Sequence, residues 1–163
     1  MEQKTHIHAE EGKQELFITR VFDLPLALLF KAYTEPGIVE QWMGTKVLLL
    51  ENKKLGAYRF ETSDANGNVL LQSCGVIHEF VENQKITRTF EMENTPFPVQ
   101  LEYLAFEELT PDTSRLTMHV VYKSATDRDN ILKLPFAFGI NRAHDLLQKM
   151  AEEFHEIPLR KKK

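Results

Sequence analysis

The stretch that decides the fold is PFAFGINRAHDLLQKMAEEFH, residues 135–155. Its apolar residues recur at spacings of four and three, which is the period of one face of an α-helix. They are Phe136, Ile140, Ala143, Leu147, Met150 and Phe154. Pro135 suits the first turn of a helix, and Pro158 opposes much continuation beyond His155. The pattern predicts a long amphipathic helix that packs one face against another layer of the protein.

The chain before this helix is predicted to form strands and two short helices. Alternation of apolar and polar residues indicates half-buried strands. The candidates are 16–22, 47–50, 58–62, 69–80, 86–92, 99–109 and 116–122, with a hairpin turn at Asn66-Gly67. After the first of them, Asp23 and Pro25 open a short helix, Glu35-Pro36-Gly37 interrupts it, and a second short helix ends at Gly44.

This order predicts an α+β protein. An antiparallel sheet curls as it twists and leaves one face to be covered. The C-terminal helix, with a rise of about 1.5 Å per residue, spans nearly 30 Å, and it is the only element long enough to cover that face. We expect a helix-grip fold, in which a curved antiparallel sheet of about six to seven strands wraps around that helix. A straight helix cannot fill a concave sheet, so a space is expected between them. The predicted organisation is a flexible lead-in over 1–13, one domain over 14–157 and a basic tail over 158–163.

The composition excludes several classes of function. Without the basic tail, 16 basic residues stand against 24 acidic ones, and this net charge of −8 disfavours nucleic acid as a partner. The longest apolar run, 47–50, is far shorter than the roughly 20 residues of a membrane span, so no membrane insertion is expected. A single cysteine, Cys74, excludes an internal disulfide and a cysteine-based zinc site, and it favours the cytoplasm. No cofactor or metal is expected.

Several short segments together resemble a known family. They are FKAYTEP at 30–36, IVEQW at 38–42, GAYRF at 56–60, GVIHEF at 75–80, ITRTF at 86–90, FEEL at 106–109 and SRLT at 114–117. In this order, over about 14–155, they resemble the homologues of the activator of heat-shock-protein-90 ATPase, in the START and birch-allergen-like helix-grip superfamily (SRPBCC). The resemblance implies a largely apolar internal cavity that binds hydrophobic small molecules, and it implies no family-wide catalytic residues. The eukaryotic activator has a further N-terminal domain that 13 leading residues cannot supply, so a chaperone partner stays unsupported.

Matching the apolar faces of the hairpin around Asn83 predicts part of the cavity wall. In this register Phe80 pairs with Ile86, and the inward face also holds the pairs His78–Arg88, Val76–Phe90 and Cys74–Met92. With a bulge near Tyr103–Leu104, the expected lining is Trp42, Tyr58, Phe60, Cys74, Val76, His78, Arg88, Phe90, Leu101, Tyr103, Met118, Val120, Tyr122, Phe138 and His144.

An inward arginine needs an anion, because an unpaired buried charge costs several kcal/mol. A ligand carboxylate or phosphate would serve Arg88. The plainer alternatives are a position at the rim or a protein carboxylate as its partner. His119, which lies in the opposite phase from Met118 and Val120, is expected to point outward.

Three functions remain open. The first is a non-enzymatic binder or carrier of a hydrophobic small molecule, with or without an acidic group. The second is a cyclase, dehydratase or hydrolase that uses His78, Arg88 and Tyr58 in the same cavity. The third is a protein-interaction module, such as a co-chaperone, that acts through its outer surface. The sequence leaves the ligand and the oligomeric state undetermined.

Overall fold

The computed structural model describes residues 4–161, with all side chains in that range except those of 136–138 and 154–161. In this part of the chain eight strands form one antiparallel sheet in the order β1-β2-β8-β7-β6-β5-β4-β3. The strands are β1 (His6–His8), β2 (Glu15–Phe22), β3 (Lys46–Leu50), β4 (Ala57–Ser63), β5 (Val69–Val81), β6 (Lys85–Met92), β7 (Gln100–Thr110) and β8 (Thr113–Val121). The helices are α1 (Leu26–Thr34), α2 (Pro36–Met43), α3 (Ala125–Leu132) and α4 (Phe136–Lys161).

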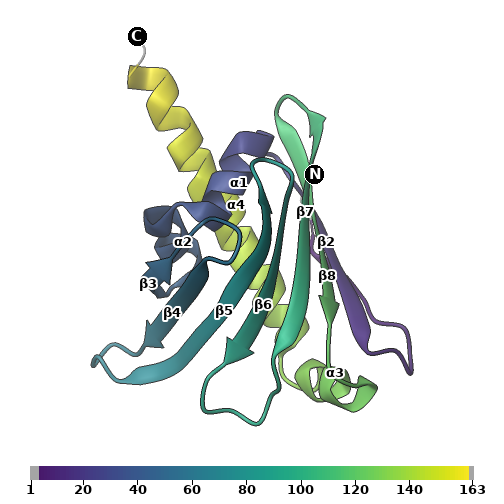
Figure 1. Cartoon of the computed structure of the whole chain (residues 1–163). Helices are drawn as coiled ribbons and strands as arrows, with labels where there is room; N and C mark the ends of the chain where they lie inside the picture. Colours follow the sequence, from purple (N-terminus) through teal and green to yellow (C-terminus); the bar gives the residue numbers. More distant parts are fainter. Residues whose placement is uncertain (1–3, 162–163) are drawn as a thin grey trace.

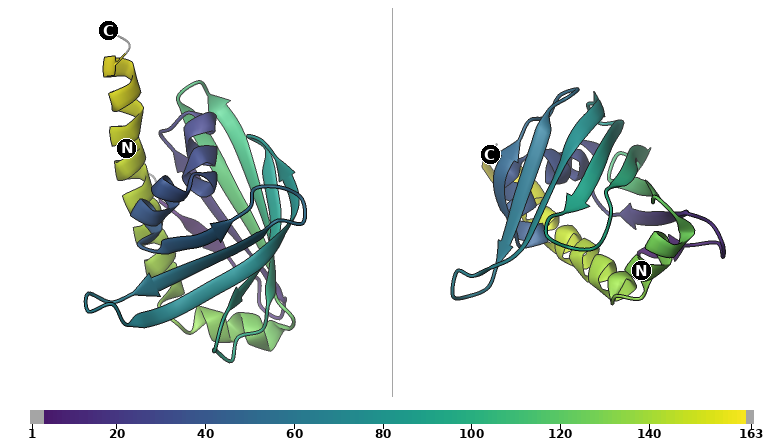
Figure 2. Two further views of the ribbon diagram at one scale, coloured as in Figure 1. Left: turned by 60° about the vertical axis from the view of Figure 1, so that its left-hand side comes forward. Right: turned by 60° about the horizontal axis from the view of Figure 1, so that its bottom comes forward.

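The twisted sheet curves around α4, and α1 and α2 lie on the same side of the sheet (Figures 1 and 2). The core is the layer between them, where Ile18 of β2, Leu104 of β7 and Leu116 of β8 are fully buried, as is Leu147 of α4. This arrangement confirms the predicted α+β helix-grip fold and its two short helices after the first long strand. The sheet has more strands than the six or seven expected, because the short edge strand β1 was not recognised.

Strand β1 lies in the segment predicted to be a flexible lead-in. His6 pairs with Thr19, and Thr5 donates its backbone N–H to Asn141 Oδ1 of α4 at 3.0 Å. This part of 1–13 therefore packs against the domain, as an edge strand of its sheet. A three-residue strand gives too little alternation to be recognised from the sequence.

Two helical predictions also differ from the structure. Helix α3 was not expected, although Ser124 caps it by accepting a hydrogen bond from the backbone N–H of Asp127. Helix α4 runs to Lys161, beyond both Pro158 and the predicted domain boundary at 157. The prediction overstated the effect of Pro158, because a proline removes one backbone hydrogen bond and can kink a helix without ending it. Residues 162–163 of the predicted tail lie outside the described residues.

A β-bulge in β5 overturns the register predicted for the hairpin. Phe80 pairs with Ile86 as expected, but the register then shifts by one residue, so that Ile77, not His78, pairs with Arg88. The shift reverses the phase of the rest of β5, because successive side chains point to opposite faces. Cys74, Val76 and His78 therefore lie on the outer face of the sheet, and the prediction that they line the interior is wrong.

The phase of β7 was also predicted wrongly. Its ladders with β6 and β8 continue without interruption through Tyr103 and Leu104, where a bulge was expected. Glu102, Leu104 and Phe106 are buried on the inner face, and Leu101 and Tyr103 lie on the outer face. Tyr103 stacks there on His119, which points outward as predicted, with ring centroids 5.5 Å apart. In a half-buried strand the aromatic side chain usually points inward and the carboxylate outward, whereas Tyr103 and Glu102 do the reverse.

Candidate functional site

The candidate site is the inner face of the sheet where it packs against α4. Several predicted lining residues lie on this inner side and are at least partly buried: Trp42, Tyr58, Phe60, Arg88, Phe90, Met118, Val120, Tyr122 and His144. The side chain of Phe138 lies outside the described residues. Cys74 and Val76 instead line a hollow of about 520 Å³ on the outer face of the sheet, together with Arg59 and Glu91.

A buried ion pair lies at the centre of the inner face. Arg88 Nε donates to Glu102 Oε1 at 3.0 Å, and the two side chains are only 8% and 7% exposed. Gln100 donates to the other oxygen of Glu102 at 2.8 Å, and the Arg88 guanidinium lies 5.0 Å from the centre of the Tyr58 ring. Of the partners considered for Arg88, the structure shows a protein carboxylate. Sequence reasoning missed Glu102 because the apolar residues on either side of it were assigned to the interior.

Burial sets the protonation states around this pair. It raises the pKa of Tyr33 and of Tyr58, and Glu102 raises both further, although Arg88 acts in the opposite direction. Burial by itself lowers the pKa of Arg88, but Tyr58 and Glu102 outweigh it and hold that pKa above its ordinary value. Tyr33, Tyr58 and Arg88 therefore keep their protons at neutral pH.

Inward-facing side chains become more accessible towards one end of the sheet. Ile86 and Arg88 are buried, whereas Phe90 and Met92, further along β6, are only half-buried. On β7, Leu104 is buried and Gln100, at the start of the strand, is half-buried. This end of the sheet lies where α3 and the start of α4 meet it (Figure 2). We call it the open end.

Tyr122 adds an unused polar group at the open end. It follows β8 directly, and the last pair of the β7–β8 ladder, Leu101 with Val121, places it near Gln100. Its hydroxyl is buried and has no hydrogen-bond partner among the described residues. Burial, followed by the nearby Glu102 charge, raises the pKa of Tyr122, so the hydroxyl keeps its proton. An unpaired buried hydroxyl costs about 1–3 kcal/mol, which an acceptor on a ligand would offset.

His144 contributes a second unpaired atom, from α4. Arg20 donates to Thr5 Oγ1 at 3.3 Å and to Asp145 Oδ1 at 2.7 Å, and Thr5 Oγ1 lies 2.8 Å from His144 Nδ1. Because Thr5 accepts from Arg20, its own proton is available for Nδ1, which leaves the imidazole proton on Nε2. Nε2 is buried and has no partner within the described part of the chain. Burial, with the Arg20 charge, lowers the pKa of His144 to about 4, so the ring is neutral at pH 7.

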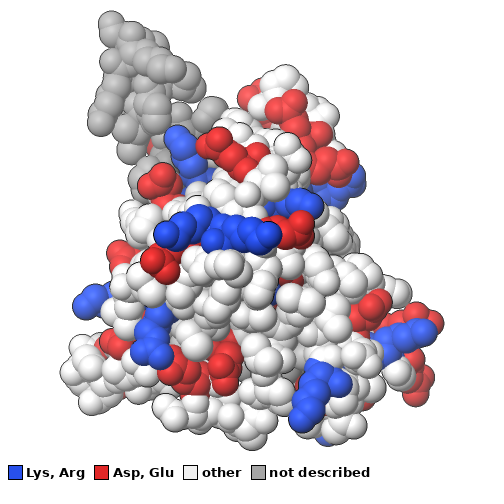
Figure 3. Space-filling view, viewed as in Figure 1, with Lys and Arg blue, Asp and Glu red and all other residues white. Residues whose placement is uncertain are grey.

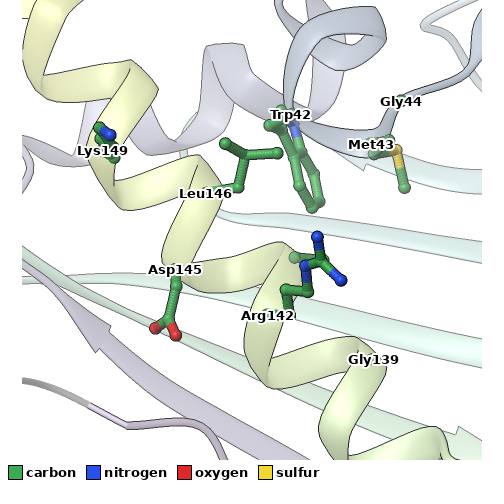
Figure 4. A pocket seen from close by; sticks show the side chains of 9 residues that line it. Trp42, Met43, Gly44, Gly139, Arg142, Asp145, Leu146 and Lys149 are labelled. Atoms are coloured by element: carbon green, nitrogen blue, oxygen red, sulfur yellow. The ribbon is translucent and has the colours of Figure 1, made fainter.

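A separate groove runs along the outside of the molecule between α2 and α4 (Figure 4). Its volume is about 470 Å³. Its lining consists of Trp42, Met43 and Gly44 from the end of α2 and Gly139, Arg142, Ala143, Asp145, Leu146 and Lys149 from α4. Trp42 donates its indole N–H to the carbonyl of Ala32 at 2.7 Å, which fixes the ring at the floor of the groove.

Charge on the remaining surface is mixed. On the face seen in Figure 3, acidic and basic side chains are interspersed between uncharged areas. This face therefore lacks the continuous basic area that phosphate backbones require. Within residues 4–161, the helices are all too short or too polar to cross a bilayer.

Comparison with known structures supports the architecture. Protein Ms6760 from Mycobacterium smegmatis is 19% identical, with a TM-score of 0.79 over 90% of this chain and 96% of that one. A protein from Arthrobacter aurescens is 12% identical, with a TM-score of 0.80 over 91% of each chain. Protein NE0264 from Nitrosomonas europaea is 15% identical, with a TM-score of 0.74 over 88% of this chain and 97% of that one. At such identities the likeness establishes the fold alone.

Sequence comparison identifies the family. Among curated proteins, none matches the chain significantly. Residues 23–152 match the sequence profile described as activator of Hsp90 ATPase homolog 1-like protein. The match spans most of the chain, from the residue after β2 into the second half of α4. It includes the segments whose order suggested this resemblance. The chain belongs to the family of activator of Hsp90 ATPase homolog 1-like proteins.

Proposed function

We propose that the protein binds a largely apolar small molecule between the sheet and α4, and that the molecule enters at the open end. The observation that carries the proposal is the gradient of accessibility along the inner face. Phe90 and Met92 belong to the same inward row as the buried Ile86, yet they stay half-buried. A ligand that covered them would remove apolar surface from water, which yields about 25 cal/mol per Å².

The polar groups of the interior favour a hydrogen-bond acceptor on the ligand over an acid. Arg88, the expected anchor for a carboxylate, is already neutralised by Glu102. Tyr122 offers an unpaired hydroxyl proton beside the half-buried row. A carbonyl, ester or ether oxygen would satisfy it without bringing a second negative charge close to Glu102. Binding of apolar ligands in an interior cavity is also what the resemblance to the helix-grip superfamily implies.

The enzyme alternative requires His78, Arg88 and Tyr58 to meet in one cavity. His78 lies on the outer face, whereas Arg88 and Tyr58 lie inside, so the three groups do not converge. The alternative of a protein-interaction module rests on a different observation, the groove between α2 and α4.

The single thiol, that of Cys74, is free, which is consistent with a reducing compartment, and we propose the cytoplasm.

A pair of matched substitutions tests the interior site. N-Phenyl-1-naphthylamine, an uncharged aromatic probe whose fluorescence rises in apolar surroundings, is titrated into wild type, Met92→Trp and Glu91→Trp. Met92→Trp fills the open end and should weaken binding about tenfold, which corresponds to about 1.4 kcal/mol. Glu91→Trp adds the same ring to the outer face and should leave the affinity unchanged. Equal affinities for the three proteins would contradict the proposal.

The natural ligand is sought separately. Native mass spectrometry of the protein purified from cells should show a bound species, and denaturation should release a mass that identifies an apolar molecule. Re-addition of that molecule should displace the fluorescent probe from wild type. If the released molecule binds Met92→Trp as tightly as wild type, it occupies another site and the proposed location is wrong.

A further inference from the structure

The groove between α2 and α4 combines an apolar floor with unpaired positive charge. Leu146 is directed at Trp42, as Figure 4 shows, and Leu146 and Met43 are 42% and 38% exposed. Trp42 itself is only 4% exposed, so it forms a recessed floor and not a projecting anchor. An apolar surface with this shape suits an inserted side chain from a partner.

Two glycines keep the ends of the groove open. Gly44 ends α2 in the left-handed conformation, with φ 64°, and Gly139 lies in the first turn of α4. A Cβ atom placed on either glycine would meet nothing within 4 Å, so both positions face free space. A rod-shaped occupant can therefore pass along the groove without meeting a side chain at these points.

The charges on α4 determine which occupant fits. Asp145, the acidic residue of the lining, is paired with Arg20 at 2.7 Å, and Figure 4 shows it directed away from Trp42. Arg142 and Lys149 are exposed, and neither has an ion-pair or hydrogen-bond partner among the described side chains. Among the described residues, the lining of the groove therefore carries positive charge that no carboxylate pairs with, in a protein whose net charge is −4.

The spacing of these cations matches a helix. Arg142 and Lys149 are seven residues apart on α4, which is two turns or about 10 Å, and Leu146 lies between them. A partner helix packed along α4 would present acidic residues two turns apart with an apolar residue between them. A flat lipid surface would not reach the recessed Trp42.

We propose that the groove between α2 and α4 docks an acidic amphipathic helix of a partner protein, with an apolar side chain over Trp42 and Leu146 and carboxylates on Arg142 and Lys149. This groove shares Trp42 with the inner side but opens on the outside of the molecule, so the proposal does not depend on the proposed ligand. Docking of an apolar helical face into a groove is a common mode of peptide recognition. The two cations would set the orientation of the partner helix and its rate of association.

The test uses a synthetic helical peptide of about 18 residues, long enough to be helical in isolation. It has Leu at three- and four-residue spacing and Glu beside each Leu, and the control peptide has Lys in place of every Glu. Fluorescence anisotropy should show binding of the acidic peptide to wild type and at least tenfold weaker binding of the basic one. The double variant Arg142→Ala/Lys149→Ala should lose at least tenfold in affinity and much of its salt dependence.

Matched controls separate docking from general effects of charge and apolar surface. Lys133→Ala removes an exposed cation at the end of α3, and Leu134→Ala removes an apolar residue exposed to a similar degree as Leu146. Both should bind the acidic peptide like wild type, whereas Leu146→Glu should abolish binding. Each of these variants should also bind the fluorescent probe of the interior site unchanged, which distinguishes failure of this proposal from failure of the first.

Three results would overturn the proposal. The first is equal binding of the acidic and basic peptides, or an affinity unchanged in Arg142→Ala/Lys149→Ala. The second is concentration-dependent self-association in analytical ultracentrifugation that Leu146→Glu removes, because the occupant would then be a second copy of this chain. The third is binding to phosphatidylglycerol vesicles, abolished by the same substitutions, without binding to the acidic peptide.

Discussion

Replacement of Arg88 by Met tests the buried ion pair most sharply. The substitution keeps an unbranched apolar stem of similar length and removes only the charged end. It leaves the Glu102 carboxylate inside the protein, with the 2.8 Å hydrogen bond from Gln100 as its remaining described contact. Breaking a buried pair in this way costs about 3–5 kcal/mol, because the surviving charge has lost its cationic partner and is shielded from water.

The expected magnitude follows from the size and geometry of the pair. Both side chains are less than 9% exposed, so solvent cannot screen the charge that remains. At about 2–4 °C per kcal/mol for a domain of this length, the melting temperature should fall by roughly 10 °C. The double variant Arg88→Met/Glu102→Met removes both charges and should regain at least 2 kcal/mol relative to the single variant, since apolar replacement of a whole buried pair is often neutral.

Urea denaturation monitored by circular dichroism measures these free energies of unfolding. Arg59→Met is the matched control, because Arg59 forms an ion pair of similar length, 2.8 Å, with Glu93 but is 45% exposed. It should cost no more than about 1 kcal/mol. The reasoning would be refuted if Arg88→Met cost as little as Arg59→Met, or if the double variant were no more stable than the single one.

Three further outcomes are expected. The folded-state pKa of His144 is about 4, below the unfolded value of 6.5, so its contribution to stability is complete above pH 6.5 and is lost as the pH falls towards 4. That loss is about 3 kcal/mol, and urea titrations between pH 7 and pH 4 should show a correspondingly shallower fall for His144→Gln. Gly75→Ala should destabilise by about 1–3 kcal/mol in the same assay, because the added Cβ would lie 2.0 Å from the carbonyl oxygen of Thr89, whereas Gly37→Ala, with open space around it, should be neutral or stabilising. Tyr122→Phe removes an unpaired buried hydroxyl, so the melting temperature should stay the same or rise. The affinity for the natural ligand, measured in a displacement titration, should fall several-fold.

The parts of the fold that follow from periodicity were predictable from the sequence. The four-and-three spacing of apolar residues before Met150 specifies α4, and the alternating runs specify most of the long strands. The cap of α3 was also present in the sequence, because Ser124 and Asp127 have the spacing of a capping pair. The three-residue β1 carries no comparable signal, since its partners on β2 and α4 lie far along the chain.

The orientation of individual side chains was less predictable, for a definite physical reason. One extra residue at the bulge near His78 reverses the phase of the earlier part of β5, and alternation alone cannot locate such a bulge. On β7, Tyr103 stacks on His119 on the outer face of the sheet. The neighbouring Glu102 therefore points inward, because successive side chains of a strand point to opposite faces. The inward Arg88 was correctly predicted, but its partner depended on this unrecognised phase.

The most direct test of the central claim is nuclear magnetic resonance of protein labelled with 13C in its methionine methyl groups, titrated with the uncharged probe N-phenyl-1-naphthylamine. Met92 lies at the open end of the interior, whereas Met43 lines the groove between α2 and α4. We expect the Met92 signal to shift in a saturable manner and to show nuclear Overhauser contacts with the probe, while the Met43 signal stays in place. A shift confined to Met43, or saturable binding that leaves Met92 unaffected, would contradict an interior binding site.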